Sequence, residues 1–174
     1  GIVDTDMLAA DSVTAPKIGS KTFTSYAIIA DQKSNGTDAG TFSSGDWRTR
    51  DLNTEIEDAD SIVSISSNQF TLQSGSYYIE AIAPAYLVVS HQIKLYQTSG
   101  TPADVAFGTS TYASSAMRVM DISKLFTRVT ISSATTYEIR HRCSSTKTNN
   151  GFGVNLGGSF GQELYSVVKI FKEA

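Results

Sequence analysis

The fold class is decided by one stretch of the sequence, YEIRHRC at residues 137–143. Its first, third, fifth and seventh residues are Tyr, Ile, His and Cys, and charged side chains fill the positions between them. This period-two alternation is typical of a β-strand with one buried face and one face in water. Residues 91–95, HQIKL, alternate in the same way. The two stretches predict strands of an antiparallel sheet that is covered on one side.

Three other apolar stretches carry bulky side chains on both faces: Tyr26–Ala30, Tyr77–Ile82 and Leu164–Phe171. A strand that is apolar on both faces must be covered on both, and the second sheet of a sandwich covers only one. No long segment has helical periodicity, so the other face needs a different cover. We expect another copy of the chain there, in an obligate homo-oligomer whose inner sheet faces a symmetry axis. The alternative is that flanking loops cover this face.

Short β-like runs separated by Gly, Ser, Asn and Thr continue from Thr24 to the end of the chain, which predicts an all-β, two-sheet antiparallel sandwich. A short extra strand is expected at Trp47–Leu52, and the acidic stretch Glu55–Asp60 is expected to be a solvated turn. The main runs are Tyr26–Ala30, Ile62–Leu72 with a break near Asn68, Tyr77–Ala83, His91–Tyr96, Met117–Ile122, Arg128–Ser132, Tyr137–Cys143 and Leu164–Phe171.

Residues 1–22 are polar with isolated apolar positions, so this segment buries too little to fold alone. We interpret residues 1–22 as a linker or the end of an intertwined stalk, and residues 23–174 as one head domain. Because the chain starts at Gly1 without Met, we interpret it as part of a longer protein.

The composition excludes several classes of function. The 174 residues carry a net charge of -3, which argues against a nucleic-acid partner. No apolar run approaches the ~20 residues of a membrane span, so no membrane insertion is expected. The single cysteine, Cys143, can form neither an intrachain disulfide nor a multi-thiolate metal site. The sequence predicts no cofactor and no metal.

No catalytic residue is predicted either. Cys143 and His141 share a strand face, but that face also carries Tyr137 and Ile139, so both side chains are expected in the apolar core, where a thiol is inert. His91 shares its strand face with Ile93 and Leu95, so a structural role in the core is expected for it as well. The acidic side chains between Glu55 and Asp60 lack the glycine turn of a calcium loop and are interpreted as a solvated charge run.

Arginine side chains offer a possible anion site. Arg48, Arg50 and Arg118 could bind an acidic sugar through bidentate bonds, but each has an aspartate within a few residues, and pairing with Asp46, Asp51 or Asp121 is the favoured interpretation. For Trp47, a packing role is favoured over that of a platform for a sugar.

The order of the strands predicts where the long loops lie. If eight main strands alternate in direction, both termini lie at one end, and the loops Asp31–Asp46 and Ser144–Gly161 lie together at the other. Long loops on a rigid scaffold commonly carry recognition. The predicted receptor contacts are Asn149, Asn150, Phe152 and Asn155.

Several stretches together resemble the trimeric jelly roll of tumour necrosis factor and the complement globular heads: Gly75–Ile79, His91–Gly100 and Gly161–Phe171. Others resemble the C-terminal domains of tailed-phage fibre proteins, namely Trp47–Asn53, Ser64–Leu72 and Ile139–Cys143. Residues 11–18 resemble the last shaft repeat of such fibres. No acidic cluster matches the calcium ligands found in some complement heads.

The resemblance implies a homotrimeric domain at the distal end of a tail fibre, in the virion, with Tyr78, Tyr165, Val167 and Phe171 at the trimer interface. Its implied role is to attach a phage to a bacterial surface polysaccharide or another cell-surface receptor. Two alternatives stay open: a structural trimerisation cap without a ligand, and a capsule-degrading enzyme.

Overall fold

The computed structural model describes residues 22–158 and 160–174, and this part of the chain is all-β. The predicted segment 1–22 therefore lies, apart from Thr22, outside the described residues. The strands are β1 (Phe23–Lys33), β2 (Arg48–Thr49), β3 (Thr54–Glu57), β4 (Val63–Ser66), β5 (Gln69–Leu72), β6 (Gly75–Tyr86), β7 (Val89–Gln97), β8 (Ala103–Phe107), β9 (Thr111–Ala113), β10 (Met120–Ile131), β11 (Thr135–Cys143) and β12 (Glu163–Glu173).

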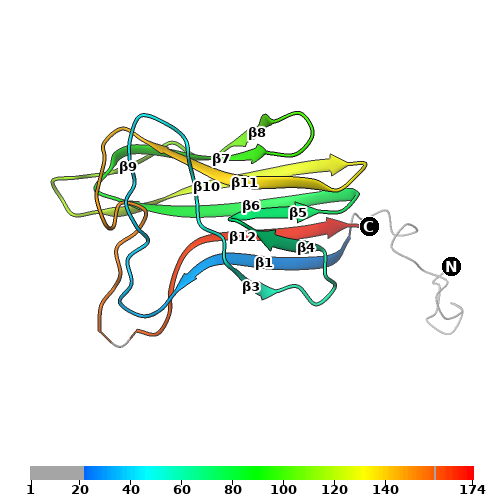
Figure 1. Ribbon diagram of the computed structural model, residues 1–174, viewed down its shortest axis with the longest axis horizontal. Helices are drawn as coiled ribbons and strands as arrows, with labels where there is room; N and C mark the ends of the chain where they lie inside the picture. The colour runs from blue at the N-terminus through cyan, green and yellow to red at the C-terminus, as the bar shows by residue number, and fades with distance from the viewer. Residues whose placement is uncertain (1–21, 159) are drawn as a thin grey trace, which may run out of the picture.

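The strands form two antiparallel sheets that pack face to face as a sandwich (Figure 1). One sheet has the order β10-β6-β12-β1-β3, and we refer to it as the inner sheet. The outer sheet has the order β4-β5-β11-β7-β8, with β2 added beside β11 and β9 beside β7. The predicted fold class, an all-β antiparallel sandwich, is confirmed.

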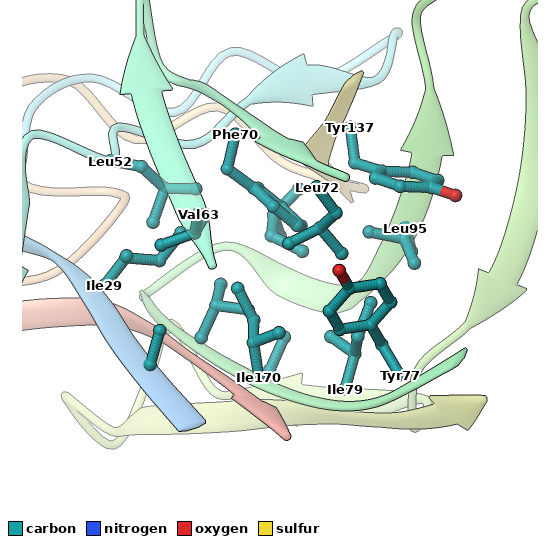
Figure 2. Close-up of a cluster of buried hydrophobic side chains, with 14 of the residues drawn as sticks. Ile29, Leu52, Val63, Phe70, Leu72, Tyr77, Ile79, Leu95, Tyr137 and Ile170 are labelled. Atoms are coloured by element: carbon teal, nitrogen blue, oxygen red, sulfur yellow. The ribbon is translucent and has the colours of Figure 1, made fainter. Parts of the chain in front are cut away.

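The core fills the space between the two sheets (Figure 2). The outer sheet contributes Phe70, Leu95 and Tyr137, and the inner sheet contributes Ile79 and Ile170 from β6 and β12; all are at most 1% exposed. The buried face predicted for β11 is confirmed, because Tyr137, Ile139, His141 and Cys143 are all buried. On the opposite face Arg142 is exposed as predicted, but Glu138 is buried, so this face is only partly in water. Burying one such large apolar side chain contributes roughly 1.5–3 kcal/mol, so the sheets are held together mainly by this layer.

The structure confirms the break expected within residues 62–72, which form the hairpin β4–β5. Ser67 and Asn68 make its turn with φ angles of 52° and 64°, the conformation of a two-residue hairpin turn that matches the strand twist. The short strand expected near Trp47 is present as β2.

Three expectations about the strands are wrong or incomplete. The runs 117–122 and 128–132 belong to one strand, β10, which pairs with β6 from Met120 to Ile131. The acidic stretch 55–60 is a strand for part of its length, because β3 adds to the edge of the inner sheet beside β1. Strands β8 and β9 were not expected at all. Both lie at the edge of the outer sheet, where a strand can form without a clear alternation of apolar and polar residues.

The two ends of the described domain lie together. Phe23 pairs with Glu173, and the amide of Ala174 donates to the carbonyl of Thr22 at 3.0 Å. The long loops β1–β2 and β11–β12 lie at the opposite end (Figure 1), as the strand order predicts. We call these loops, residues 34–47 and 144–162, the tip loops.

Within residues 22–158 and 160–174, no helix has the length and hydrophobicity that a membrane span requires.

Candidate functional site

The inner sheet has a second face, turned away from the core, on which apolar side chains gather. Strand pairing places them in rows across β10, β6, β12 and β1; one row runs from Arg128 through Tyr78 and Phe171 to Tyr26. We call this surface the free face. Its apolar members are Tyr26, Ile28, Tyr78, Ile82, Ile122, Phe126, Val167 and Phe171.

The free face is exposed in the single chain. Phe126 and Tyr26 expose 55% and 50% of their surface, although aromatic rings of this size are normally more buried. At the end near the termini, the rings of Phe23 and Phe171 pack with centroids 5.1 Å apart. Charged side chains separate these apolar residues, because Glu80 and Lys169 stand in the row between Phe126 and Ile28 and form an ion pair of 3.9 Å. Large apolar side chains that gather on one exposed sheet face favour an interaction surface in soluble proteins.

Of the four side chains predicted at the trimer interface, Tyr78, Val167 and Phe171 lie on the free face, and Tyr165 does not. A bulge in β12 places both Tyr165 and Ser166 opposite Asp31, and all three are at most 4% exposed. The hydroxyl of Tyr165 donates to the carbonyl of Thr37 at 2.7 Å, so a tip loop of the same chain covers this ring. The interface prediction for Tyr165 therefore fails, since a bulge reverses the face on which the following side chains lie.

On the solvent face of the outer sheet, charged side chains pack directly on aromatic rings. The ammonium of Lys94 lies 4.3 Å from the ring centroid of Trp47 and 2.5 Å from Asp104 Oδ1. The guanidinium of Arg140 stacks 3.5 Å from the ring of Tyr96 and pairs with Glu138. These cation–π and ionic contacts satisfy the outer sheet without a partner. Exposed large apolar side chains are more numerous on the inner sheet than on the outer one, which favours the inner sheet as an interaction surface.

The tip loops bind each other. Phe42 and Lys147 exchange two backbone hydrogen bonds of 3.0 Å, and the amide of Phe152 donates to the carbonyl of Gly40 at 3.1 Å. The rings of Phe42 and Phe152 stack with centroids 4.3 Å apart, over a small core of their own that includes Val88 and Cys143. The tip is therefore an ordered, packed structure.

The four predicted receptor contacts do not form one exposed cluster. Asn149 is exposed, with a φ of 68°. Asn150 is half-buried, and its Oδ1 is buried without a hydrogen-bond partner among the described residues. Phe152 packs in the tip core. Asn155 donates two hydrogen bonds to Asp38 Oδ1, one from its backbone N at 2.8 Å and one from its side-chain Nδ2 at 2.6 Å. Phe152 and Asn155 thus have internal contacts in the tip, and the receptor role stays a prediction for all four residues.

Arg50 joins the tip to the sandwich. Its side chain is fully buried; Nε donates to Ser166 Oγ at 2.7 Å and Nη1 to the carbonyl of Phe152 at 3.0 Å. Burial lowers the pKa of this guanidinium to about 10. Since Arg48 and Arg118 are exposed, the three arginines considered from the sequence do not form one anion site.

A buried histidine pair lies beside the tip core. Nδ1 of His91 and Nε2 of His141 share a hydrogen bond of 2.9 Å, which requires that one of these two nitrogens is unprotonated and accepts. Burial lowers the pKa of His91 to about 4 and the pKa of His141 well below its usual value, where the charge of Arg50 adds to the effect. Cys143 donates to the carbonyl of Ser145, and burial raises its pKa to about 11. Both imidazole rings and the thiol are buried, as the sequence predicts; that their role is purely structural stays a prediction.

The histidine pair makes folding sensitive to acid. Between pH 6.5 and about 4 the unfolded chain binds protons at His91 that the folded chain excludes, so stability is full above pH 6.5 and falls as the pH drops. We expect a loss of about 3 kcal/mol from His91 across this range, since one pKa unit corresponds to about 1.36 kcal/mol. Urea unfolding of the wild type and His91→Gln at pH 7.5, 6, 5 and 4 measures it. Equal pH slopes for the two proteins would contradict this assignment.

No group of three or more His, Cys, Asp or Glu side chains in the described ranges could hold a metal ion. Asp58, in the acidic stretch once expected to be solvated, instead accepts from the amides of Ile62 at 2.8 Å and Val63 at 3.1 Å. Its carboxylate fixes the turn before β4.

No protein-family model and no curated protein sequence matches the chain. Solved structures do match its fold. The globular domain of zebrafish complement 1qA is 17% identical, with a TM-score of 0.54, and the match covers 85% of this chain and 96% of that one. Eiger TNF from S. frugiperda is 10% identical, with a TM-score of 0.56, and the match covers 88% and 94%. PRD1 vertex protein P5 is 12% identical, with a TM-score of 0.54, and the match covers 87% and 98%. The chain therefore has the jelly-roll fold of the complement and TNF structures, as the sequence resemblance implies.

Proposed function

We propose that this chain is a non-enzymatic attachment domain: it assembles as a homotrimer through the free face and presents its tip loops to a bacterial cell surface, at the distal end of a phage tail fibre. The observation that carries the proposal is the free face itself, on which Phe126 and Tyr26 stay about half exposed in a single chain. A vertex protein among the structures of similar fold supports a place in a virion.

The orientation of the domain supports attachment at the tip. Both ends of the described domain lie at one pole, where Phe23 pairs with Glu173, and the tip loops lie at the other pole. A fibre joined to the domain through Thr22 would therefore point the tip loops away from the virion. Three linked copies of a weak site gain ~10²–10⁴ in avidity.

Light scattering and cell binding test the proposal together. We expect the purified chain to have about three times the 18.7 kDa mass of one copy. We also expect the fluorescently labelled protein to bind intact cells of some strains in a bacterial panel, or their extracted surface polysaccharides. A monomeric mass would overturn the proposed assembly. A trimer that binds no strain and no polysaccharide would favour the structural cap, and release of soluble sugar from capsule would favour the enzyme.

A further inference from the structure

A groove of about 580 Å³ opens at the tip end of the outer sheet, away from the four predicted receptor contacts. It lies between the ends of β7 and β11, with β9 on one side and the first tip loop on the other. Its volume is within the ~300–1,000 Å³ of typical ligand sites. The residues that matter for its chemistry are Trp47, Ser90, His91, Gln92, Ser110 and Arg142.

The walls of the groove offer polar groups that the fold does not use. Ser90 and Ser110 are exposed, and neither hydroxyl makes a hydrogen bond to another described residue. Gln92 donates through Nε2 to the carbonyl of Gly108 at 2.8 Å, which fixes the amide and leaves its oxygen free to accept. His91 also lines the groove and is 3% exposed; its Nε2 has no partner in the described ranges.

Trp47 gives the groove one apolar wall. The ammonium of Lys94, 4.3 Å from the ring centroid, and the ring of Phe107, 6.0 Å away, hold the indole in place. An aromatic wall that is already ordered before binding lowers the entropic cost of association. An indole beside several hydroxyl and amide groups suits a ligand with one apolar face and many hydroxyls.

The groove also carries an uncompensated positive charge. Arg142 is exposed and forms no ion pair with any residue that the structure describes. No Asp or Glu lines the groove; in the adjacent loop, Asp46 accepts a 2.7 Å hydrogen bond from the amide of Trp47. A guanidinium in this setting suits a planar carboxylate, which it binds through two parallel hydrogen bonds.

We infer that the groove binds a carboxylate-bearing sugar unit of an acidic surface polysaccharide. Arg142 binds the carboxylate, Gln92 and the two serines bind ring hydroxyls, and Trp47 packs against the apolar face of the sugar. This inference rests on the proposed attachment function. The groove is formed by the outer sheet and the tip, so a trimer built through the free face of the inner sheet leaves it open in all three copies.

Calorimetric titration of the full chain with defined oligosaccharides tests the inference. One set of probes ends in glucuronic, galacturonic or N-acetylneuraminic acid, and the other ends in glucose or galactose. We expect at least one acidic probe to bind about 10- to 100-fold more tightly than the neutral ones, the contribution typical of a charge-assisted pair. Arg142→Gln should remove this difference. Arg118→Gln is the matched control, because it removes an exposed charge in the tip region from outside the groove.

The inference is overturned if no acidic probe binds, if neutral probes bind equally, or if Arg142→Gln binds as the wild type does. Cell binding measured on the same proteins separates the two proposals. Cells bound equally by wild type and Arg142→Gln would leave attachment standing and reject the groove as its site. If the protein binds an acidic probe through Arg142 but binds no bacterial strain, the groove is supported and cell attachment is rejected.

Discussion

Phe126→Glu is expected to prevent the proposed trimer from assembling, so that the protein is monomeric. The residue is 55% exposed on the free face, and it pairs across β10 and β6 with Glu80. A trimer built on this face buries the substituted side chain in three copies, each beside another carboxylate. Because Glu80 already pairs with Lys169 at 3.9 Å, the main cost is that of desolvating the new charge, which is several kcal/mol and enough to shift assembly by orders of magnitude. Light scattering at micromolar concentration gives the mass directly.

Phe107→Glu is the matched control for this experiment. Phe107 is also 55% exposed, but it lies on β8 at the edge of the outer sheet. We expect this variant to keep the mass of the wild type, because its side chain lies outside the proposed interface. If Phe126→Glu keeps the wild-type mass, the free face is not the interface. If both variants become monomeric, the loss reflects added charge in general and the assignment of the inner sheet also fails.

Gly151→Ala should open the tip and strongly destabilise the fold. A Cβ atom at Gly151 would lie 2.5 Å from the carbonyl oxygen of Lys147 and 2.7 Å from Cβ of Phe42, so the backbone of the tip loops must separate. This movement breaks the hydrogen bonds between Phe42 and Lys147 and disturbs the stacking on Phe152. We expect a loss of about 2–4 kcal/mol, from overpacking and from unpaired backbone groups.

Thermal unfolding measures this loss, since 1 kcal/mol corresponds to about 2–4 °C in a domain of this size. Gly157→Ala is the control within the same loop. Gly157 has a φ of 66°, and its nearest contact for a Cβ is Asn155 Oδ1 at 3.8 Å, so only backbone strain of about 1 kcal/mol is expected. Equal losses of unfolding free energy in the two variants would mean that the stability of the tip does not depend on the close packing of the two loops at Gly151.

The sequence predicted the sandwich well because both of its signals are local. Alternation in β11 fixed which side chains enter the core, and bulk on both faces of β1, β6 and β12 identified the sheet that lacks a cover. The expected break at Asn68 followed from turn chemistry at one position. The count of strand directions placed the two long loops at the same end, although two of its eight strands are the single strand β10; the unexpected β8 and β9 restore the alternation.

What the sequence could not predict depends on contacts between distant segments. The bulge in β12 that turns Tyr165 inward leaves no pattern in the sequence of β12, because it arises from the register of this strand against Asp31 of β1. In the sequence, Phe152 and Asn155 cannot be told from exposed loop residues. Their partners, Phe42 and Asp38, lie in the other tip loop, and only the fold brings the two loops together.

The groove was missed for the same reason. Trp47, Gln92 and Arg142 are far apart in sequence, on three different segments. Only the pairing of β7 with β11, in which Gln92 lies opposite Arg142, brings the amide and the guanidinium together. The Trp47–Leu52 stretch offered a clue, because a tryptophan just before a short added strand is expected close to the edge of a sheet. A binding role of Trp47 could not be distinguished from a packing role, because its neighbours Lys94 and Phe107 are not adjacent to it in the sequence.

The protection of Cys143 has a practical consequence. The only thiol in the chain is 4% exposed, and its pKa near 11 leaves it with roughly a hundredth of the thiolate of an ordinary cysteine at neutral pH. A cysteine introduced at an exposed position away from the tip loops, such as Ala134 between β10 and β11, would therefore take up a maleimide dye or biotin selectively, without any need to delete the native one. Single-molecule imaging on bacteria could then use a protein whose interior is unaltered.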